Sequence, residues 1–574
     1  MNRTAFAAAL AASLLLAACQ TSPSTTVDAT ADAAPAPGAV HAPPSPPSPP
    51  SPPAAAKDAA LERIEATGAR RQLAARAAAP ASAAAYTVMP PPWTPAPPVN
   101  REEYADLDDN PVRRASEHPV STFSVDVDTG SYSNVRRMLR AGVRPPPDAV
   151  RAEEFINYFS YGHPAPATRE VPFRVTTEIA PAPWDAKRHL LMVGIKGYDV
   201  PKAELPPANL VFLVDTSGSM HSPDKLPLLR QAFGALTDQL RAQDKVSIVA
   251  YAGSAGLVLP PTPGDHKGEI LAALERLQAG GSTNGGAGIT LAYAMARQGY
   301  VEGGANRVIL ATDGDFNVGT VDRDALEALV ADQRSSGIAL TTLGFGTGNY
   351  NDAMAERLAD AGDGNHAYID TLLEARKVLV EEMSSTLLTI ARDVKVQVEF
   401  NPAVVAEYRL VGYANRMLRE EDFANDRVDA GDIGAGHEVT ALYEIALAGS
   451  GGERLPPLRY GDRSATAAHG GELAHLRLRY KLPAGERSHL IEVPLRRDDI
   501  RPQAGEALRF AATVAAFADA LRGGHHLGDW DWDAISASAR ATRGDDRWGL
   551  RGEFATLVEA GRVATRDTAA SRGD

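Results

Sequence analysis

Residues 210–214 form an unalternated run of apolar side chains, LVFLV, that leads directly into the polar sequence DTSGS at residues 215–219. A run of this kind predicts a strand buried on both faces, inside a parallel sheet that helices cover. The polar loop then lies at the carboxyl end of the strand, where open α/β sheets place their ligand sites. We therefore expect a carboxylate and two hydroxyls at this edge of a sheet.

Strand-like and helix-like patterns continue to alternate up to about residue 388. Apolar runs predict strands at 209–214, 245–251, 307–311, 338–344 and 366–369, with a short strand near 257–259. Helical periodicity between them predicts helices at 225–240, 267–277, 286–297, 323–335, 353–361 and 373–388. Alternation of this kind is typical of a doubly wound, mostly parallel sheet, so we expect one Rossmann-like α/β domain over residues 206–388.

The segments on either side of this domain alternate apolar and polar residues, as half-buried antiparallel strands do. Before it, the pattern predicts strands at 120–126, 173–179 and 191–195 and helices at 133–141 and 150–162. After it, strands are predicted at 394–400, 437–447, 473–482 and 488–495, followed by helices at 506–521, 532–542 and 548–564. We expect the flanks, residues 100–205 and 389–570, to pair into one β-sandwich with a C-terminal helical segment. The α/β domain would then be inserted through two neighbouring connections.

The amino terminus has the features of an export signal. Residues 1–18 contain Arg3 and an apolar stretch, and they end in small residues just before Cys19, the one cysteine of the chain. This junction resembles the bacterial lipobox, which implies a signal peptide at 1–18, lipidation of Cys19 and a membrane anchor. Gln20 resembles an outer-membrane sorting signal. Residues 19–99 are rich in proline and alanine and are expected to form a linker of low order.

Length and charge narrow the functional classes. A chain of 574 residues is too long for one hydrophobic core. Its formal net charge of −14 argues against a nucleic-acid partner, because phosphate binding needs a basic surface.

Two further loops add ligands to the first. Thr283 lies in the glycine-rich loop GGSTNGGAG at 280–288, and Asp313 follows a predicted buried strand. Both loops lie at the same sheet edge as Asp215, Ser217 and Ser219, so these five side chains can converge. They are hard oxygen ligands suited to magnesium, with calcium and manganese as alternatives. No base stands beside either serine, which argues against nucleophilic catalysis.

The three-loop set resembles the metal-ion-dependent adhesion site of von Willebrand factor type A domains. The resemblance implies that the hydroxyls bind the ion directly while the aspartates act partly through water. Such an ion keeps net positive charge and an open position, which can accept a carboxylate from a partner protein. The flanking sequences STFSVDVDTGSYSN (121–134) and PPPDAVRAEEFINY (145–158) sharpen the resemblance to the YfbK-type bacterial lipoproteins. That family implies the architecture but no settled biochemical activity.

Two other motifs have alternative interpretations. Asp126 and Asp128 partly resemble the nucleophile loop of haloacid-dehalogenase-type phosphatases, but Thr129 is one position too early. The structural interpretation is a strand end at which Asp128 or Ser131 caps the next helix. His525 and His526, with the aspartates 529, 531 and 533, could bind a transition metal or form a solvent loop that caps the helix starting at Trp532.

The sequence thus predicts a non-enzymatic, lipid-anchored protein of the bacterial cell envelope that binds a partner protein's acidic residue through magnesium. One alternative is an envelope assembly scaffold in which the metal is structural. Another is a metal-dependent phosphatase that uses Asp126 and Asp128.

Overall fold

The structure is a computed structural model that describes residues 102, 104, 108–125, 128–281, 285–314, 323–347, 352–428, 430–456, 469–483 and 485–570. All of these belong to one compact unit, Pro95–Asp574. The predicted signal peptide and linker, with Cys19, lie outside the described residues, as do Asp126 and Thr283. Within the described part, no helix combines the length and the hydropathy that crossing a membrane requires.

The inserted domain is built on a six-stranded sheet in the order β10-β9-β8-β5-β6-β7. The central strand β5 pairs in parallel with β6 and β8, and the edge strand β7 runs antiparallel to β6. Every residue of β5 is buried, as the unalternated apolar run predicted. The strands are β5 (Ala208–Asp215), β6 (Lys245–Tyr251), β7 (Ala255–Pro263), β8 (Ala305–Thr312), β9 (Ile338–Phe345) and β10 (His366–Ile369).

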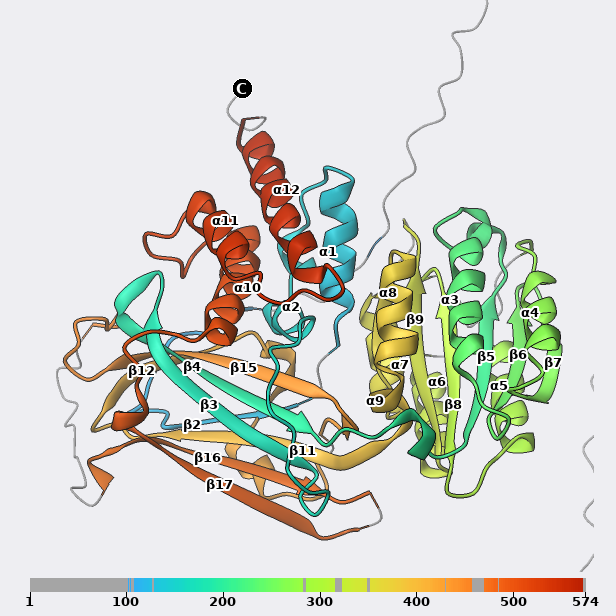
Figure 1. The fold of residues 1–574 in the computed structure, drawn as a ribbon, viewed down its shortest axis with the longest axis horizontal. Helices are drawn as coiled ribbons and strands as arrows, with labels where there is room; N and C mark the ends of the chain where they lie inside the picture. Colours follow the sequence, from blue (N-terminus) through green and yellow to red (C-terminus); the bar gives the residue numbers. More distant parts are fainter. Residues whose placement is uncertain are drawn as a thin grey trace, which may run out of the picture. The chain divides into compact units, whose positions relative to one another are not determined.

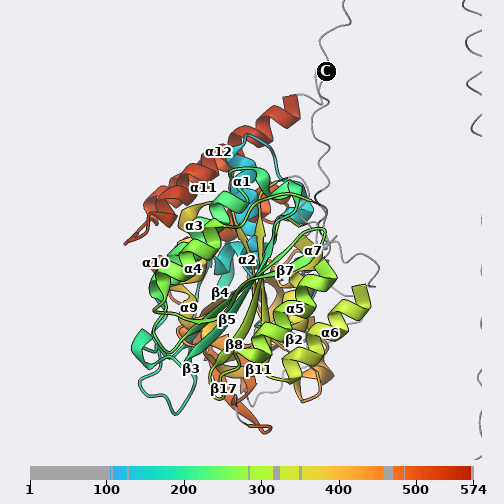
Figure 2. The ribbon, with the colours of Figure 1, turned by 90° about the vertical axis from the view of Figure 1, so that its right-hand side faces the viewer.

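Helices cover both faces of this sheet (Figure 2). On one face Phe212 of β5 stacks on Phe233 of α3, with ring centroids 4.1 Å apart. On the other face the neighbouring Val211 packs in the same cluster as Ile289 of α5. The helices are α3 (Leu226–Gln239), α4 (Lys267–Glu275), α5 (Gly285–Gln298), α6 (Arg323–Ser335), α7 (Asp352–Ala361), α8 (Leu372–Arg376) and α9 (Met383–Leu387). The doubly wound fold class is confirmed.

The flanking segments form two antiparallel sheets, in the orders β1-β12-β15-β4-β3 and β13-β2-β11-β16-β17, with β14 paired to β11. Side chains such as Phe123, Val396 and Tyr443 fill the core between them. The strands are β1 (Arg113–Arg114), β2 (Val120–Ser124), β3 (Phe173–Ala182), β4 (Asp185–Gly197), β11 (Thr389–Phe400), β12 (Val405–Val411), β13 (Met417–Leu418), β14 (Ile433–Gly434), β15 (Glu438–Leu447), β16 (Glu472–Lys481) and β17 (Ser488–Arg496).

Strands from before and after the inserted domain are neighbours in both sheets, because β2 pairs with β11 and β4 pairs with β15. The two connections to the inserted domain also meet at one short segment. Gly436 N–H donates to the carbonyl of Tyr198 at 2.9 Å, and Ala435 N–H donates to the carbonyl of Leu388 at 2.8 Å. The expected insertion through neighbouring connections is therefore confirmed.

A group of helices covers one face of the first sheet (Figure 1). Aromatic side chains, among them Tyr132, Phe155, Phe510 and Phe554, form its core together with Leu190 and Met192 of β4. The helices are α1 (Gly130–Arg140), α2 (Ala152–Asn157), α10 (Glu506–Arg522), α11 (Trp532–Ala541) and α12 (Leu550–Ala570). Helix α10 packs against α2, α11 and α12, and α1 packs against the edge strand β10 of the inserted domain.

Two predicted helices differ from the structure, and some strands, among them β12, were not predicted. The helix expected at 150–162 is only the short α2. The helix expected at 373–388 is broken into α8, a π-helical turn at Lys377–Glu381 and α9. The hydroxyls of Ser385 and Thr386 donate to the carbonyl of Glu382 at 2.7 and 3.2 Å. Both residues lie within α9, where the Thr386 N–H also donates to the Glu382 carbonyl at 3.1 Å, so the interruption lies before them.

Candidate metal centre

The carboxylate of Asp215 lies at the carboxyl end of β5 and is fully buried. Its Oδ1 accepts the backbone N–H of Ser217 at 2.8 Å, which turns the chain sharply after the strand. Its Oδ2 is 3.4 Å from the hydroxyl of Thr312, at the end of the neighbouring strand β8. The loops after two adjacent parallel strands thus meet at Asp215, as expected at the carboxyl edge of an α/β sheet.

The hydroxyls of Ser217 and Ser219 lie beside each other, with their oxygens 2.9 Å apart. Ser217 is buried and Ser219 is exposed, so the pair reaches from the interior to the surface. The glycine-rich loop is fastened to the same place. Gly218 N–H donates to the Gly281 carbonyl at 3.1 Å, and Gly280 N–H donates to the Thr216 carbonyl at 2.8 Å. The loop that carries Thr283 therefore begins next to the serines, although Thr283 itself lies outside the described residues.

Asp313 directly follows β8 and is also fully buried. Its Oδ2 accepts a hydrogen bond from the Lys225 ammonium at 2.9 Å. Its Oδ1 is buried and has no hydrogen-bond partner among the described residues. A buried carboxylate oxygen without a donor is costly, and such atoms in native structures call for an explanation.

The pKa of Asp215 reflects the same crowding of buried acids. Burial raises the pKa of Asp215 to about 6, and the nearby charge of Asp313 adds to this rise. The hydrogen bonds from Ser217 oppose it. Two buried carboxylates, one of them with an orphaned oxygen, and two hydroxyls make a donor set that fits a hard divalent cation. Four of the five predicted ligand residues are thus brought to one place.

Sequence reasoning missed Lys225, which stands just before α3 and reaches the centre through its long side chain. The available signal was a single lysine at the start of a predicted helix soon after the DTSGS loop. Such a lysine is ordinarily read as solvent-exposed, because lysine is rarely buried unless it is paired.

Known proteins match this architecture along most of the chain. Residues 209–382 match the von Willebrand factor type A domain, residues 385–563 match the C-terminal domain of "Uncharacterized protein YfbK", and residues 98–192 match the family described as von Willebrand factor. The chain is 50% identical over 464 residues to Uncharacterized protein YfbK of Escherichia coli (strain K12), covering 79% of this chain and 80% of that protein. The chain belongs to the YfbK family.

Further relatives of this YfbK-family chain are more distant. Uncharacterized protein sll0103 of Synechocystis is 27% identical over 297 residues, covering 50% of this chain and 65% of that protein. Among solved structures, the von Willebrand factor type A protein from Catenulispora acidiphila is 13% identical, with a TM-score of 0.35, and the match covers 76% of this chain and 88% of that one. BatB from Bacteroides thetaiotaomicron is 22% identical, with a TM-score of 0.27, and the match covers 31% of this chain and 97% of that one.

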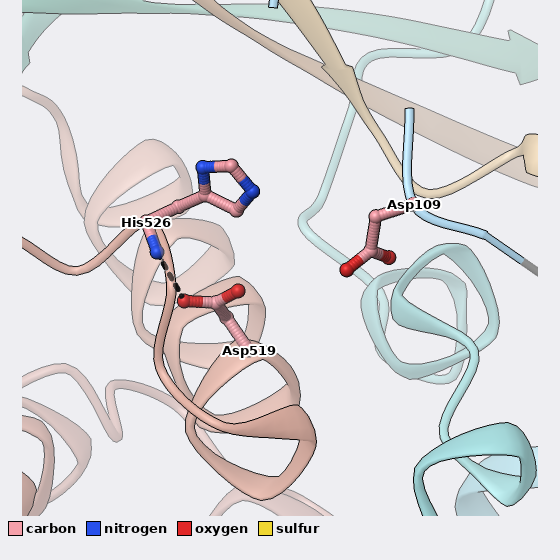
Figure 3. A group of neighbouring side chains, drawn as sticks. All are labelled: Asp109, Asp519 and His526. Carbon is pink, nitrogen blue, oxygen red and sulfur yellow. Dashed lines mark hydrogen bonds between the residues drawn. The ribbon is translucent and has the colours of Figure 1, made fainter. Parts of the chain in front are cut away.

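A second group of metal-ligand types in this YfbK-family chain consists of Asp109, Asp519 and His526 (Figure 3). Arg454 donates to Nδ1 of His526 at 3.1 Å, so the neutral ring carries its proton on Nε2 and has no lone pair left for an ion. Burial lowers the pKa of His526 to about 4, which keeps the ring neutral. Asp109 is paired with Arg522 at 3.2 Å. The group therefore does not fit a metal.

The predicted capping of the helix at Trp532 is confirmed, because Asp531 Oδ1 accepts the backbone N–H of Ala534 at 2.9 Å. Asp533 is paired with Arg562 at 3.3 Å. Asp531 and Asp533 thus serve α11 and its contact with α12.

The capping role expected of Asp128 or Ser131 at α1 is wrong, because the N-cap residue is Thr129, which makes no side-chain cap bond. Glu154 accepts the Ser131 N–H of the first turn at 2.7 Å. Instead, the buried Asp128 accepts the backbone N–H of His366 at 2.7 Å and pairs with Arg416 at 3.3 Å. Ser131 donates to the carbonyl of Ala149 at 2.6 Å. Both carboxylate oxygens of Asp128 are therefore engaged in holding the inserted domain.

Proposed function

We propose that this YfbK-family protein binds Mg²⁺ at Asp215, Ser217, Ser219, Thr283 and Asp313, and through it a carboxylate of a partner protein. Calcium and manganese are alternative ions. The matched type A domain is a module that often mediates protein interactions, which supports a protein partner. The observation that carries the proposal is the buried Oδ1 of Asp313, which no described donor satisfies, beside the buried acid Asp215.

The different surroundings of the acidic and the hydroxyl ligands favour binding of a partner over catalysis. Asp215 is engaged by the backbone of its own loop, and Asp313 is engaged by Lys225, so both acids are held in place. The serine hydroxyls are neutral and reach from the interior to the surface. A cation bound there supplies positive charge at an open position, which neutral ligands leave largely intact. An acidic side chain of a partner is the natural group to complete it.

A non-enzymatic role is part of the proposal. Among the described residues the Ser217 hydroxyl contacts the Ser219 hydroxyl, which is no general base, and the Asp215 carboxylate, which also accepts the Ser217 backbone N–H and which the proposal assigns to the metal. The phosphatase alternative is weakened because Asp128 is committed to His366 and Arg416. Turnover of a simple phosphoester that Asp126→Asn abolishes would restore that alternative.

The test of the proposal is Mg²⁺ titration of the full chain by calorimetry, combined with a pull-down from envelope extract with and without Mg²⁺. Asp215→Ala is expected to abolish both metal binding and Mg²⁺-dependent capture while the fold is retained. Asp265→Ala removes an exposed acid of the same domain and serves as the control, which should behave as the wild type. Unchanged metal affinity in Asp215→Ala would overturn the proposal.

The structure offers one observation in favour of the scaffold alternative. The inserted domain is joined to the flanks by buried ion pairs, among them Arg136 with Glu374 at 2.7 Å. A scaffold with a structural metal would capture its partner equally well in chelator, whereas the leading proposal requires that capture be lost.

The lipid anchor is a separate part of the proposal and places the protein in the bacterial cell envelope, at the outer membrane. It rests on the lipobox-like sequence that ends at Cys19. Cys19→Ala is expected to stop incorporation of labelled fatty acid and to release the protein from the membrane fraction. Unchanged fractionation of that variant would contradict the anchor.

A further inference from the structure

Lys225 places a cation inside the candidate metal centre. Its side chain is only 7% exposed, and its ammonium lies 2.9 Å from Oδ2 of Asp313. A lysine buried to this extent is normally paired, and here the partner is one of the predicted metal ligands. The contact leaves Oδ1 of the same carboxylate without a donor.

The backbone around Gly346 holds the lysine in this position. Gly346 follows β9 with φ of +73°, and a Cβ there would lie 2.3 Å from Cγ and Cε of Lys225. The carbonyl of Gly346 accepts the hydroxyl of Tyr368 from β10, which fixes that backbone. The aliphatic stem of Lys225 therefore runs in a slot that only glycine leaves open. The ammonium is built into the site.

The charges of the described groups can be counted. Asp215 and Asp313 are both fully buried, and Lys225 adds one positive charge through its ion pair with Asp313. With both acids ionised, their formal sum is −1, so a divalent cation brings the centre to +1. Without the lysine the same ion would bring it only to neutrality. Excess charge in a buried site acts strongly, because the surrounding dielectric is low.

We infer that Lys225 sets the charge of the loaded centre, weakening cation binding in exchange for a positive surplus that selects an anionic partner group. This inference rests on the proposed function. The lysine also pairs Asp313 when no ion is bound, so the domain can fold before the metal arrives. The metal can then bind and leave the folded domain, and folding does not require it.

The size of the effect follows from how one charge acts on another at contact distance. A neighbouring cation lowers the proton affinity of a carboxylate by about 1 to 3 pKa units, which is about tenfold to a thousandfold. A divalent ion at the same carboxylates feels the same repulsion. We therefore expect removal of the Lys225 charge to tighten Mg²⁺ or Mn²⁺ binding at least about tenfold.

The experiment compares the full-length wild type with Lys225→Met and Lys225→Gln. The methionine removes both charge and hydrogen bond, whereas the glutamine removes only the charge and keeps a donor near Asp313. Lys267→Met, in the first turn of α4, removes an equal charge away from the centre. Mn²⁺ affinity is measured by calorimetry. Acetate is the carboxylate probe. Acetate that displaces water from the bound Mn²⁺ lowers the relaxation rate of the water protons, and this decrease measures acetate binding.

Both neutral variants should bind Mn²⁺ at least about tenfold more tightly and acetate several-fold more weakly, while Lys267→Met matches the wild type. If one neutral variant fails to fold, the other carries the comparison. Mn²⁺ affinity that is unchanged or weaker in the neutral variants, or recovery by glutamine alone, would overturn the inference and leave the metal site intact. If the wild type binds no Mn²⁺, the proposed function fails as well.

Discussion

Asp128 and His366 connect the β-sandwich to the inserted domain across 238 positions of sequence, through a hydrogen bond of 2.7 Å from the His366 backbone N–H to Asp128 Oδ1. Asp128 comes shortly after β2, and His366 begins the edge strand β10. Arg416 pairs with the other oxygen of Asp128 and also with Glu356 of α7. Asp128 therefore acts as an anchor between the two parts.

Asp128→Ala is expected to destabilise the protein, because it leaves the His366 N–H without this acceptor and weakens the position of Arg416. Losing a buried partner of this kind costs about 1–3 kcal/mol. Thermal unfolding of the full chain measures the effect. The control is Asp199→Ala, because the Asp199 side chain is 73% exposed and its removal should change little. Equal melting temperatures for the two variants would contradict the anchoring role.

Local sequence pattern sufficed for the elements that carry the candidate metal centre. The apolar run ending at Val214 predicted β5, and the polar residues after it identified Asp215 and Ser217 as a cluster. The contacts of Lys225 and Asp128 could not be predicted in the same way. Lys225 contacts Asp313 and Asp128 contacts His366, and both partners are distant in sequence. The periodic pattern of apolar residues carries no signal of either contact. The π-helical turn at Lys377–Glu381, which interrupts the helix predicted at 373–388, was likewise not predicted.

Arg136 is the second junction between the parts and is almost fully buried. Its guanidinium binds Asp370 and Glu374 of the inserted domain and contacts Glu553 of α12. Arg136→Met is expected to cost about 3–5 kcal/mol, because buried acids lose their counter-charge. Thermal unfolding checks this, and adding Glu374→Gln should recover part of the loss. Arg169→Met, which breaks an exposed pair with Glu204, should cost at most about 1 kcal/mol.

Gly346 and Gly303 make a matched pair for testing the slot around Lys225. Both have positive φ, +73° and +67°, so alanine strains the backbone at each by about 1 kcal/mol. Open space surrounds the added Cβ at Gly303, whereas at Gly346 it collides with Lys225. Gly346→Ala should therefore lower the melting temperature further and also change Mn²⁺ affinity, which Gly303→Ala leaves alone. Equal behaviour of the two variants would show that the slot is unimportant.

His437 predicts how stability depends on pH. Burial lowers its pKa to about 4 in the folded protein, with the charges of Lys196 and Lys377 acting in the same direction and Glu438 opposing them. The unfolded chain has the ordinary value of about 6.5, so between these pH values it binds more protons than the folded state. Stability from the neutral ring is complete above about pH 6.5 and is lost as the pH falls toward 4.

His437→Gln removes this dependence on pH. The difference in unfolding free energy between pH 7 and pH 5 should shrink by about 1–2 kcal/mol, as measured by denaturant unfolding at each pH. Burial also lowers the pKa values of His163 and His526, so these two residues still make the unfolding free energy depend on pH in this variant. Replacing the exposed His118 by glutamine is the control and should leave the slope as it is. A slope that His437→Gln leaves unchanged would mean that the His437 ring takes up protons equally in both states.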